Sequence, residues 1–258
     1  MSKVISLSIL SLAATVAACG GDSSSADFPT FTYGATASPS ASEGAAASSV
    51  NSTAAPAVVN FTASPTASNA QPLMGLSSSA MTAVSFSRPR VALQQIVFHA
   101  LNPGSVQPAY DPACTKTTNG SVTLTNCSIT SGGETTTMSG SLNVSGKNVT
   151  WSFNFSGSGT TTGSGHWTGN LTVLATSLSG TANIDATAST GGASVTENWQ
   201  SDFNLTLSGS PACVASGTME TRVMFSNVQG APAGSMPPSK GAKYTWTGCG
   251  KVAVAHSL

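Results

Sequence analysis

From Ser121 to the C-terminus, apolar and polar residues alternate with a period of two. In the clearest run, Val149–Phe155, Val, Trp, Phe and Phe alternate with Thr, Ser and Asn. Such alternation is typical of strands with one buried face and one solvent face. The apolar positions of the other runs are Trp167, Leu171 and Val173; Leu178, Ala182 and Ile184; Trp199, Phe203, Leu205 and Leu207; Met219, Val223 and Phe225; and Tyr244, Trp246, Val252 and Val254.

Short glycine-rich segments such as Ser131-Gly132-Gly133 and Gly191-Gly192 separate these runs. Connections this short favour antiparallel neighbours in sequential order. The expected fold is therefore mainly β, an antiparallel meander of about 7–8 strands. A sheet of that size is expected to curl or to become barrel-like, because this hides its edges.

One short helix is predicted before the sheet, from about Pro89 to Leu101. Pro89 suits a first helical turn, and Asn102-Pro103-Gly104 ends the pattern. A pair of strands is the alternative, since Val84 and Phe86 alternate with polar residues. The helical apolar face consists of Leu93, Ile96, Val97, Ala100 and Leu101.

The segment before this helix, from Gly20 to about Gln71, consists mostly of Ser, Ala, Thr, Gly and Pro. Such a composition predicts a flexible tether, because it buries too little apolar surface to offset the ordering entropy. A coil of about 50 residues has an end-to-end distance of roughly 40 Å. The aromatic exceptions, to which the pattern gives no role, are Phe28, Phe31, Tyr33 and Phe61.

The N-terminus carries a secretory signal. Lys3 precedes the apolar core Val4–Val16, and the small residues Ala17 and Ala18 precede Cys19. The stretch Val16-Ala17-Ala18-Cys19 resembles the lipobox of bacterial lipoproteins. An ordinary secretory peptide with a nearby cysteine is the alternative.

The resemblance implies that residues 1–18 are a removed signal peptide and that Cys19 becomes the first residue, with a diacylglycerol on its sulfur. Two or three acyl chains would anchor the protein stably in a membrane. The expected location is the bacterial cell envelope, and the outer membrane because Gly20 rather than Asp follows Cys19. The expected organisation is signal 1–18, tether 19–71 and a single β-rich domain over 72–258.

The charge content of the chain excludes one class of partner. Only 7% of the residues are charged, with nine of each sign. Since no cationic patch can form from so few charges, nucleic acid is not an expected partner.

Four cysteines remain after Cys19, an even number that indicates two disulfides in an oxidising compartment. Three pairings are possible. The tripeptide Pro-Ala-Cys occurs at Cys114 and at Cys213, each time followed by one more cysteine, which favours Cys114–Cys127 and Cys213–Cys249. Cys127 and Cys249 are out of step with the apolar residues of their runs, so they lie on the polar face or beside a bulge.

No catalytic or metal-binding motif is present, so the sequence predicts neither an enzyme nor a cofactor. His99, His166 and His256 are isolated, and zinc-type cysteine spacing is lacking. Glu197 shares the parity of the apolar residues and is expected to point inward or to lie near a rim, on the face opposite to Asp202. Glu220 and Arg222 are expected to form an exposed pair on the polar face.

The sequence therefore predicts a lipid-anchored envelope protein with a non-enzymatic structural or binding role, whose protein, glycan or lipid partner is not specified. One alternative is a carrier that holds an apolar ligand inside the curled sheet. A second is a small outer-membrane barrel, because apolar and polar residues also alternate in transmembrane strands. A third is a hydrolase built from scattered residues, with His166 as its best candidate.

Overall fold

The computed structural model describes residues 28, 30–82, 112–131, 134–159, 162–190, 192–209, 212–230 and 239–258. Two helices, α1 (Ala41–Ala63) and α2 (Ala67–Thr82), come first, and a 3-10 turn, η1 (Pro112–Cys114), leads into the strands. The strands are β1 (Thr115–Thr117), β2 (Ser121–Ser131), β3 (Glu134–Ser145), β4 (Asn148–Ser158), β5 (Thr162–Leu174), β6 (Ser177–Thr190), β7 (Ala193–Gly209), β8 (Ala212–Gln229), β9 (Lys240–Gly248) and β10 (Lys251–His256).

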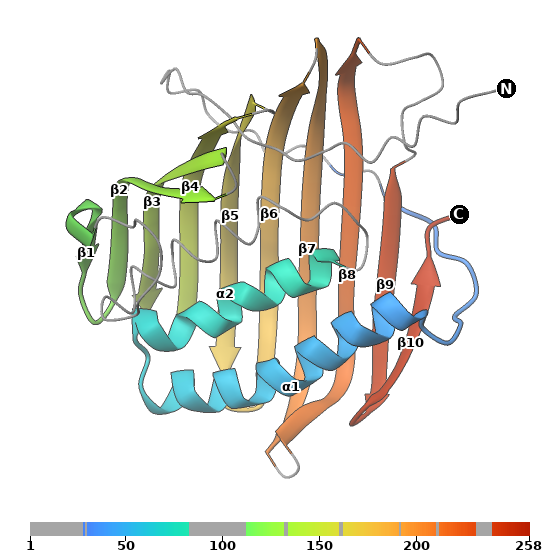
Figure 1. Ribbon diagram of the computed structural model, residues 1–258. Coiled ribbons are helices and arrows are strands. Elements are labelled where there is room, and N and C mark those ends of the chain that lie inside the picture. Colours follow the sequence, from blue (N-terminus) through green and yellow to red (C-terminus); the bar gives the residue numbers. More distant parts are fainter. Residues whose placement is uncertain are drawn as a thin grey trace, which may run out of the picture.

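The ten strands form one antiparallel sheet in which each strand pairs with its neighbours in sequence. This confirms the predicted mainly β meander. β1 and β10 are separate edges, so the sheet curls but does not close (Figure 1). The sheet has ten strands where about 7–8 were predicted. Strands such as β1 and the threonine-rich β3 were missed because they are short or polar and their apolar alternation is weak.

The two faces of the sheet differ sharply in burial. In β4, Trp151 and Phe153 are buried, whereas Thr150, Ser152 and Asn154 between them are exposed. We call the face that carries Trp151 the inner face and the opposite one the outer face. The apolar residues that alternate in the sequence lie on the inner face of β4 to β10, as predicted.

Both helices lie across the inner face and run antiparallel to each other (Figure 1). α1 contacts β5–β8 and β10, and α2 contacts β3, β7 and β8. Neither helix is long and apolar enough to cross a membrane, judged over the described residues. The buried helical residues that join the core include Val50, Ala54, Val58, Phe61, Leu73, Met74 and Leu76.

These helices correct the prediction of a flexible tether over residues 19–71. The residues of α1 are small, and small side chains let a helix approach an aromatic sheet face closely. Ser40 caps α1, and its backbone N–H donates to the Glu43 carboxylate at 2.8 Å, which completes a capping box. The helix predicted at 89–101 lies outside the described residues.

Polar contacts fix the helices on the sheet at three places. Oε1 of Glu43 lies 3.2 Å from Nε2 of His256 in β10. Oδ1 of Asn51 accepts a 2.9 Å hydrogen bond from the Val214 N–H of β8. At the start of α2, the Ala67 N–H donates to the Asn119 carbonyl at 2.8 Å. The helices are therefore an integral layer of the fold.

The chain before α1 extends the sheet beyond β10. The N–H groups of Gly34 and Ala37 donate to the carbonyls of His256 and Val254 at 2.9 and 2.8 Å. The Leu258 N–H donates in return to the Thr32 carbonyl at 2.9 Å. We call residues 32–37 the edge segment, because it covers hydrogen-bonding groups that β10 would otherwise expose.

Glycine is needed at two inner-face positions where atoms of a neighbouring strand lie very close to the backbone. Trp151 of β4 lies over Gly169 of β5, and a Cβ at Gly169 would overlap the indole ring. At Gly180 the backbone has φ of +137°, a region that L side chains rarely adopt, and a Cβ there would overlap the Asn170 carbonyl. Close strand packing, not turn formation, selects these two glycines.

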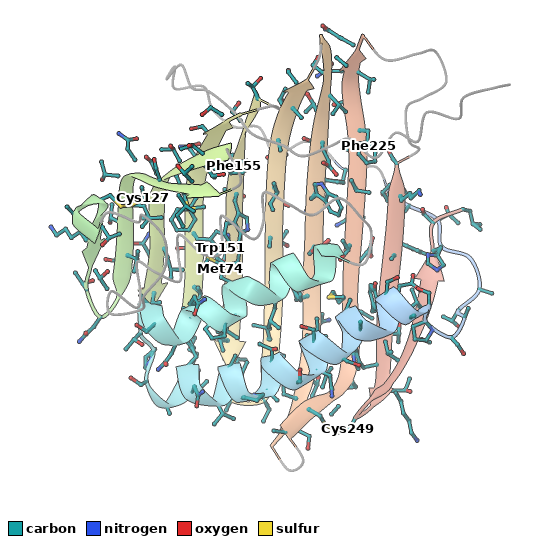
Figure 2. All side chains as sticks on the ribbon, in the orientation of Figure 1. Met74, Cys127, Trp151, Phe155, Phe225 and Cys249 are labelled. Carbon is teal, nitrogen blue, oxygen red and sulfur yellow. A yellow bond between two sulfur atoms is a disulfide. The ribbon has the colours of Figure 1, made fainter. Side chains whose placement is uncertain are left out.

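The structure confirms both predicted cysteine pairs. The Cα atoms of Cys114 and Cys127 are 5.2 Å apart, and those of Cys213 and Cys249 are 5.5 Å apart. A register shift between Leu124 and Cys127 brings Cys127 onto the buried inner face. Of the two placements expected for Cys127, on the polar face or beside a bulge, the structure shows the bulge. Cys249 lies in the exposed turn between β9 and β10. Figure 2 places Cys127 and Cys249 near opposite edges of the sheet.

Candidate functional site

Uncharged hydroxyl and amide side chains make up most of the outer face of β3–β7. The strand register aligns them in rows that cross the sheet, with neighbours about 4.8 Å apart and successive rows about 7 Å apart. On the described outer face of β3–β6, His166 and Asp185 are the ionisable side chains. One such row consists of Ser141, Ser152, Thr168, Asn183 and Gln200.

Hydrogen bonds between neighbouring strands order part of this surface. Oγ of Ser128 lies 2.7 Å from Oγ1 of Thr137, and the Thr130 and Thr135 hydroxyl oxygens are 2.9 Å apart. The Thr172 hydroxyl donates to Oδ1 of Asn148 at 3.1 Å. The face is therefore a partly preorganised array of donors and acceptors.

A serine, a histidine and an aspartate lie on three consecutive strands of the outer face. Oγ of Ser152 is 2.9 Å from Nε2 of His166, and Asp185 is the cross-strand partner of His166. Burial raises the pKa of Asp185 above its usual range, and the nearby His166 partly offsets this.

These are the residue types of a hydrolytic triad, but their surroundings do not suit acyl transfer. They lie in the middle of β4, β5 and β6, where backbone N–H groups bond to neighbouring strands. An oxyanion needs backbone or side-chain donors aimed at one point above the nucleophile. In these paired strands the backbone N–H groups point along the sheet toward the neighbouring strands and not toward a point above Ser152. The side chains of Ser152, His166 and Asp185 remain as hydrogen-bonding groups of the outer face.

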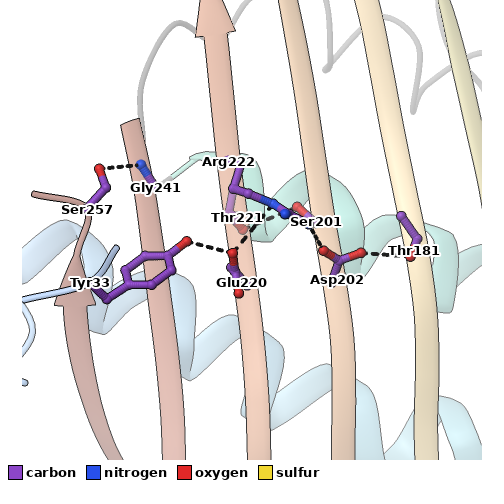
Figure 3. A network of polar contacts seen from close by, with 9 residues as sticks. All are labelled: Tyr33, Thr181, Ser201, Asp202, Glu220, Thr221, Arg222, Gly241 and Ser257. Atoms are coloured by element: carbon purple, nitrogen blue, oxygen red, sulfur yellow. Dashed lines mark hydrogen bonds and ion pairs between the residues drawn. The ribbon is translucent and has the colours of Figure 1, made fainter. Parts of the chain in front are cut away.

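A charged network lies beside this uncharged region, on β6–β8 (Figure 3). The Arg222 guanidinium forms an ion pair with Asp202 and lies 3.5 Å from Oε1 of Glu220. The Thr181 hydroxyl donates to Oδ1 of Asp202 at 2.7 Å. Asp202 thus faces outward as predicted, whereas the side chain of Glu197 is buried on the inner face.

The N-terminal segment covers this network, which corrects the expectation of an exposed Glu220–Arg222 pair. The Tyr33 hydroxyl donates to Oε1 of Glu220 at 2.7 Å. The Phe28 ring lies 5.7 Å from the guanidinium carbon of Arg222, a cation–π distance. The side chains of Arg222 and Glu220 are consequently only 16% and 23% exposed.

The backbone of β9 makes room for Tyr33. A Cβ at Gly241 would lie only 2.7 Å from the Tyr33 hydroxyl oxygen, so glycine is required for this docking. Burial, then the hydrogen bond to Glu220, raises the pKa of Tyr33 well above its ordinary value. Tyr33 is therefore a neutral donor over the whole physiological pH range.

The inner face carries three buried donor groups that have no hydrogen-bond partner within the described ranges. They are Nε1 of Trp151, Nε1 of Trp167 and the hydroxyl of Tyr244. The two indoles pack edge to face with centroids 6.1 Å apart. Burial, then the charge of Glu43, raises the pKa of Tyr244. These donors lie among apolar side chains beneath the helices.

The remaining candidates lie apart from one another. His256 ends β10 beside Glu43, while His99 and Cys19 lie outside the described residues. In the part of the chain that the structure describes, no three His, Cys, Asp or Glu side chains are grouped as metal ligands. Sequence reasoning missed the roles of Phe28 and Tyr33. The available signal was the presence of aromatic residues in a stretch otherwise built from small ones.

No family model, curated protein or solved structure matches this chain. Its function is therefore inferred from its own residues.

Proposed function

We propose that this protein is a lipid-anchored component of the bacterial cell envelope with a non-enzymatic binding role. Its outer face, over β3–β7, contacts an uncharged polar polymer such as a neutral polysaccharide. The single observation that carries this proposal is the composition of that face. Its rows consist mostly of hydroxyl and amide groups, and the ionisable side chains on the described part of this face are His166, Asp185 and Asp202.

An uncharged donor and acceptor array fits a neutral, hydroxyl-rich partner for an energetic reason. Burying a charge against a neutral polymer would leave that charge without compensation, which is costly. Hydroxyl and amide groups exchange hydrogen bonds with water for hydrogen bonds with the polymer at little cost. The ordered pair Asn148–Thr172 on β4 and β5 reduces the entropy lost on binding.

The proposed location rests on the lipobox resemblance at Cys19 and is supported by the two disulfides. Disulfides persist in compartments outside the cytoplasm. A lipid anchor at Cys19 would hold the domain at an envelope membrane, where neutral glycans are available as partners.

The test uses purified residues 20–258 with disulfides formed. Co-sedimentation with insoluble neutral polysaccharides, and affinity electrophoresis through soluble ones, would measure saturable binding. Heparin, a polyanion, serves as the comparison polymer. Thr150→Lys with Asn170→Lys places two charges on directly paired outer-face positions. A matched control, Ser52→Lys with Val59→Lys, adds the same charge on exposed positions of α1.

We expect saturable binding to at least one neutral polysaccharide and a loss of about tenfold in affinity, about 1.4 kcal/mol, for the outer-face variant alone. If no neutral polysaccharide binds, or if both variants lose affinity equally, the proposed contact face is wrong.

A second candidate, a carrier of an apolar ligand with a polar group, is favoured by the inner-face donors. Trp151, Trp167 and Tyr244 offer three buried donors under the helices to such a polar group. Titration with a fluorescent fatty acid tests this candidate. Saturable binding that is weakened by Trp167→Phe would support a carrier, and absence of saturable binding would exclude it for fatty acids.

A further inference from the structure

We propose that the edge segment holds the lipid anchor beside β9 and β10, so that this edge of the sheet faces the membrane. The inference rests on the proposed acylation of Cys19 and adds an orientation to it. The partner surface is the headgroup layer of the bilayer that contains the acyl chains of Cys19.

The edge segment is attached by main-chain and side-chain contacts together. Main-chain bonds join Gly34 and Ala37 to β10, and join Thr32 to Leu258, two residues after the end of β10. Side chains of Tyr33 and Phe28 reach further, to Glu220 and Arg222 on the outer face of β8. Described contacts therefore attach the chain to the sheet at Phe28 and again over residues 32–37.

The length of chain before the attachment point limits how far the domain can stand from its anchor. Phe28 is nine residues after Cys19. Nine residues span about 30 Å even when fully extended. The opposite edge of the sheet lies further from the anchor, because β2 is six strand spacings, or about 29 Å, away from β8. The β8–β10 side is therefore the side that the anchor brings to the bilayer.

The charges of this edge suit a headgroup layer. β9 and β10 carry Lys240, Lys243 and Lys251 and no carboxylate. Two carboxylates lie near these strands and both have partners: Glu220, opposite Lys243, accepts from Tyr33, and Glu43 pairs with His256 at the end of β10. Lysine ammonium groups near a bilayer are attracted to anionic lipid headgroups.

Lysine acylation read by mass spectrometry tests the orientation within a single molecule. The acylated mature protein is inserted into preformed vesicles of phosphatidylcholine and phosphatidylglycerol. It is then treated with an amine-reactive reagent, alongside non-acylated residues 20–258 in solution. Lys116 and Lys147, on β1 and on the β3–β4 turn, are internal controls far from the anchor. The mass of the N-terminal peptide establishes separately whether Cys19 carries lipid.

We expect the modification rates of Lys240, Lys243 and Lys251 to fall at least about threefold on vesicles, while Lys116 and Lys147 react as they do in solution. Gly34→Pro with Ala37→Pro removes two N–H donors of the edge segment. This variant should remain bound to vesicles but lose the selective protection. Thr36→Pro is the matched control, because the Thr36 N–H makes no bond to β10 in the described structure, and it should keep the protection.

Equal labelling of all five lysines on vesicles, or protection that falls on Lys116 and Lys147, would overturn the orientation while leaving lipid anchoring intact. Protection that survives in the double-proline variant would overturn the role of the edge segment. An unmodified Cys19 would overturn both the orientation and the proposed anchoring.

Discussion

The Tyr33 hydroxyl donates a 2.7 Å hydrogen bond to Oε1 of Glu220, although 187 residues separate the two in sequence. The bond attaches the first part of the described chain to β8, one of the last strands in the sequence. Together with the main-chain bonds to β10, it makes the segment before α1 part of the sheet. A region that composition describes as a linker is therefore structural.

Replacing Tyr33 by Phe should destabilise the protein by about 1 kcal/mol, because a hydrogen bond to a charged, partly exposed group is lost. Urea unfolding measures this change. Tyr244→Phe is the matched control, since the Tyr244 hydroxyl has no hydrogen-bond partner among the described residues, and its removal should be neutral or stabilising. Equal losses for both variants would contradict the role assigned to Tyr33.

Alkaline pH should destabilise the fold. The folded protein raises the pKa of Tyr33 and of Tyr244, so at a pH above the ordinary tyrosine value of about 10 the unfolded chain releases protons that the folded protein keeps. The stability contributed by the neutral hydroxyls is complete below that pH and is lost as pH rises beyond it. Unfolding free energies measured from neutral pH to above pH 10 should fall, and a Tyr33→Phe, Tyr244→Phe variant should show a shallower fall.

Gly169→Ala should cost about 2 kcal/mol or more, because its Cβ would overlap the Trp151 indole on the inner face. Thermal unfolding followed by tryptophan fluorescence reports both the stability and the ring environment. Gly44→Ala in α1 is the control, since a Cβ there meets no atom within 4 Å and should stabilise the helix by about 0.5–1 kcal/mol. A neutral Gly169→Ala would show that the strands do not pack this closely.

Removing the disulfides should destabilise the protein unequally. In the loop-entropy treatment, closing the 13-residue separation of Cys114–Cys127 contributes about 3 kcal/mol, and closing the 36-residue separation of Cys213–Cys249 about 4 kcal/mol. Each Cys→Ala pair is compared with the parent by urea unfolding. A larger loss for the Cys114–Cys127 pair would contradict this order.

The strands were predictable because most large apolar residues of β4–β9 occupy alternate positions, as Trp151, Trp199 and Tyr244 show. The pairing of the cysteines followed from a repeated tripeptide. α1 was missed because alanine-rich stretches carry little apolar contrast, so the buried face of Ala54 and Val58 does not differ enough from its neighbours. The serine at 40 followed by Glu43 was the available local signal.

The site was less predictable than the fold. Parity placed Glu197 inward and Asp202 outward, but it could not reveal that Tyr33 covers Glu220, because long-range docking of an isolated aromatic leaves no periodic pattern. Likewise, the approach of His166 to Ser152 depends on a diagonal contact between strands, which requires the register that only the folded sheet defines.

The most direct test is the mass of the N-terminal peptide of the mature protein isolated from its native envelope. Both the proposed anchoring in the envelope and the membrane-facing edge depend on a lipid at Cys19. We expect the peptide to begin at Cys19 and to carry a thioether-linked diacylglycerol, with a further acyl group on the amine. A mature chain that begins at another residue, or at a Cys19 without lipid, would contradict this expectation.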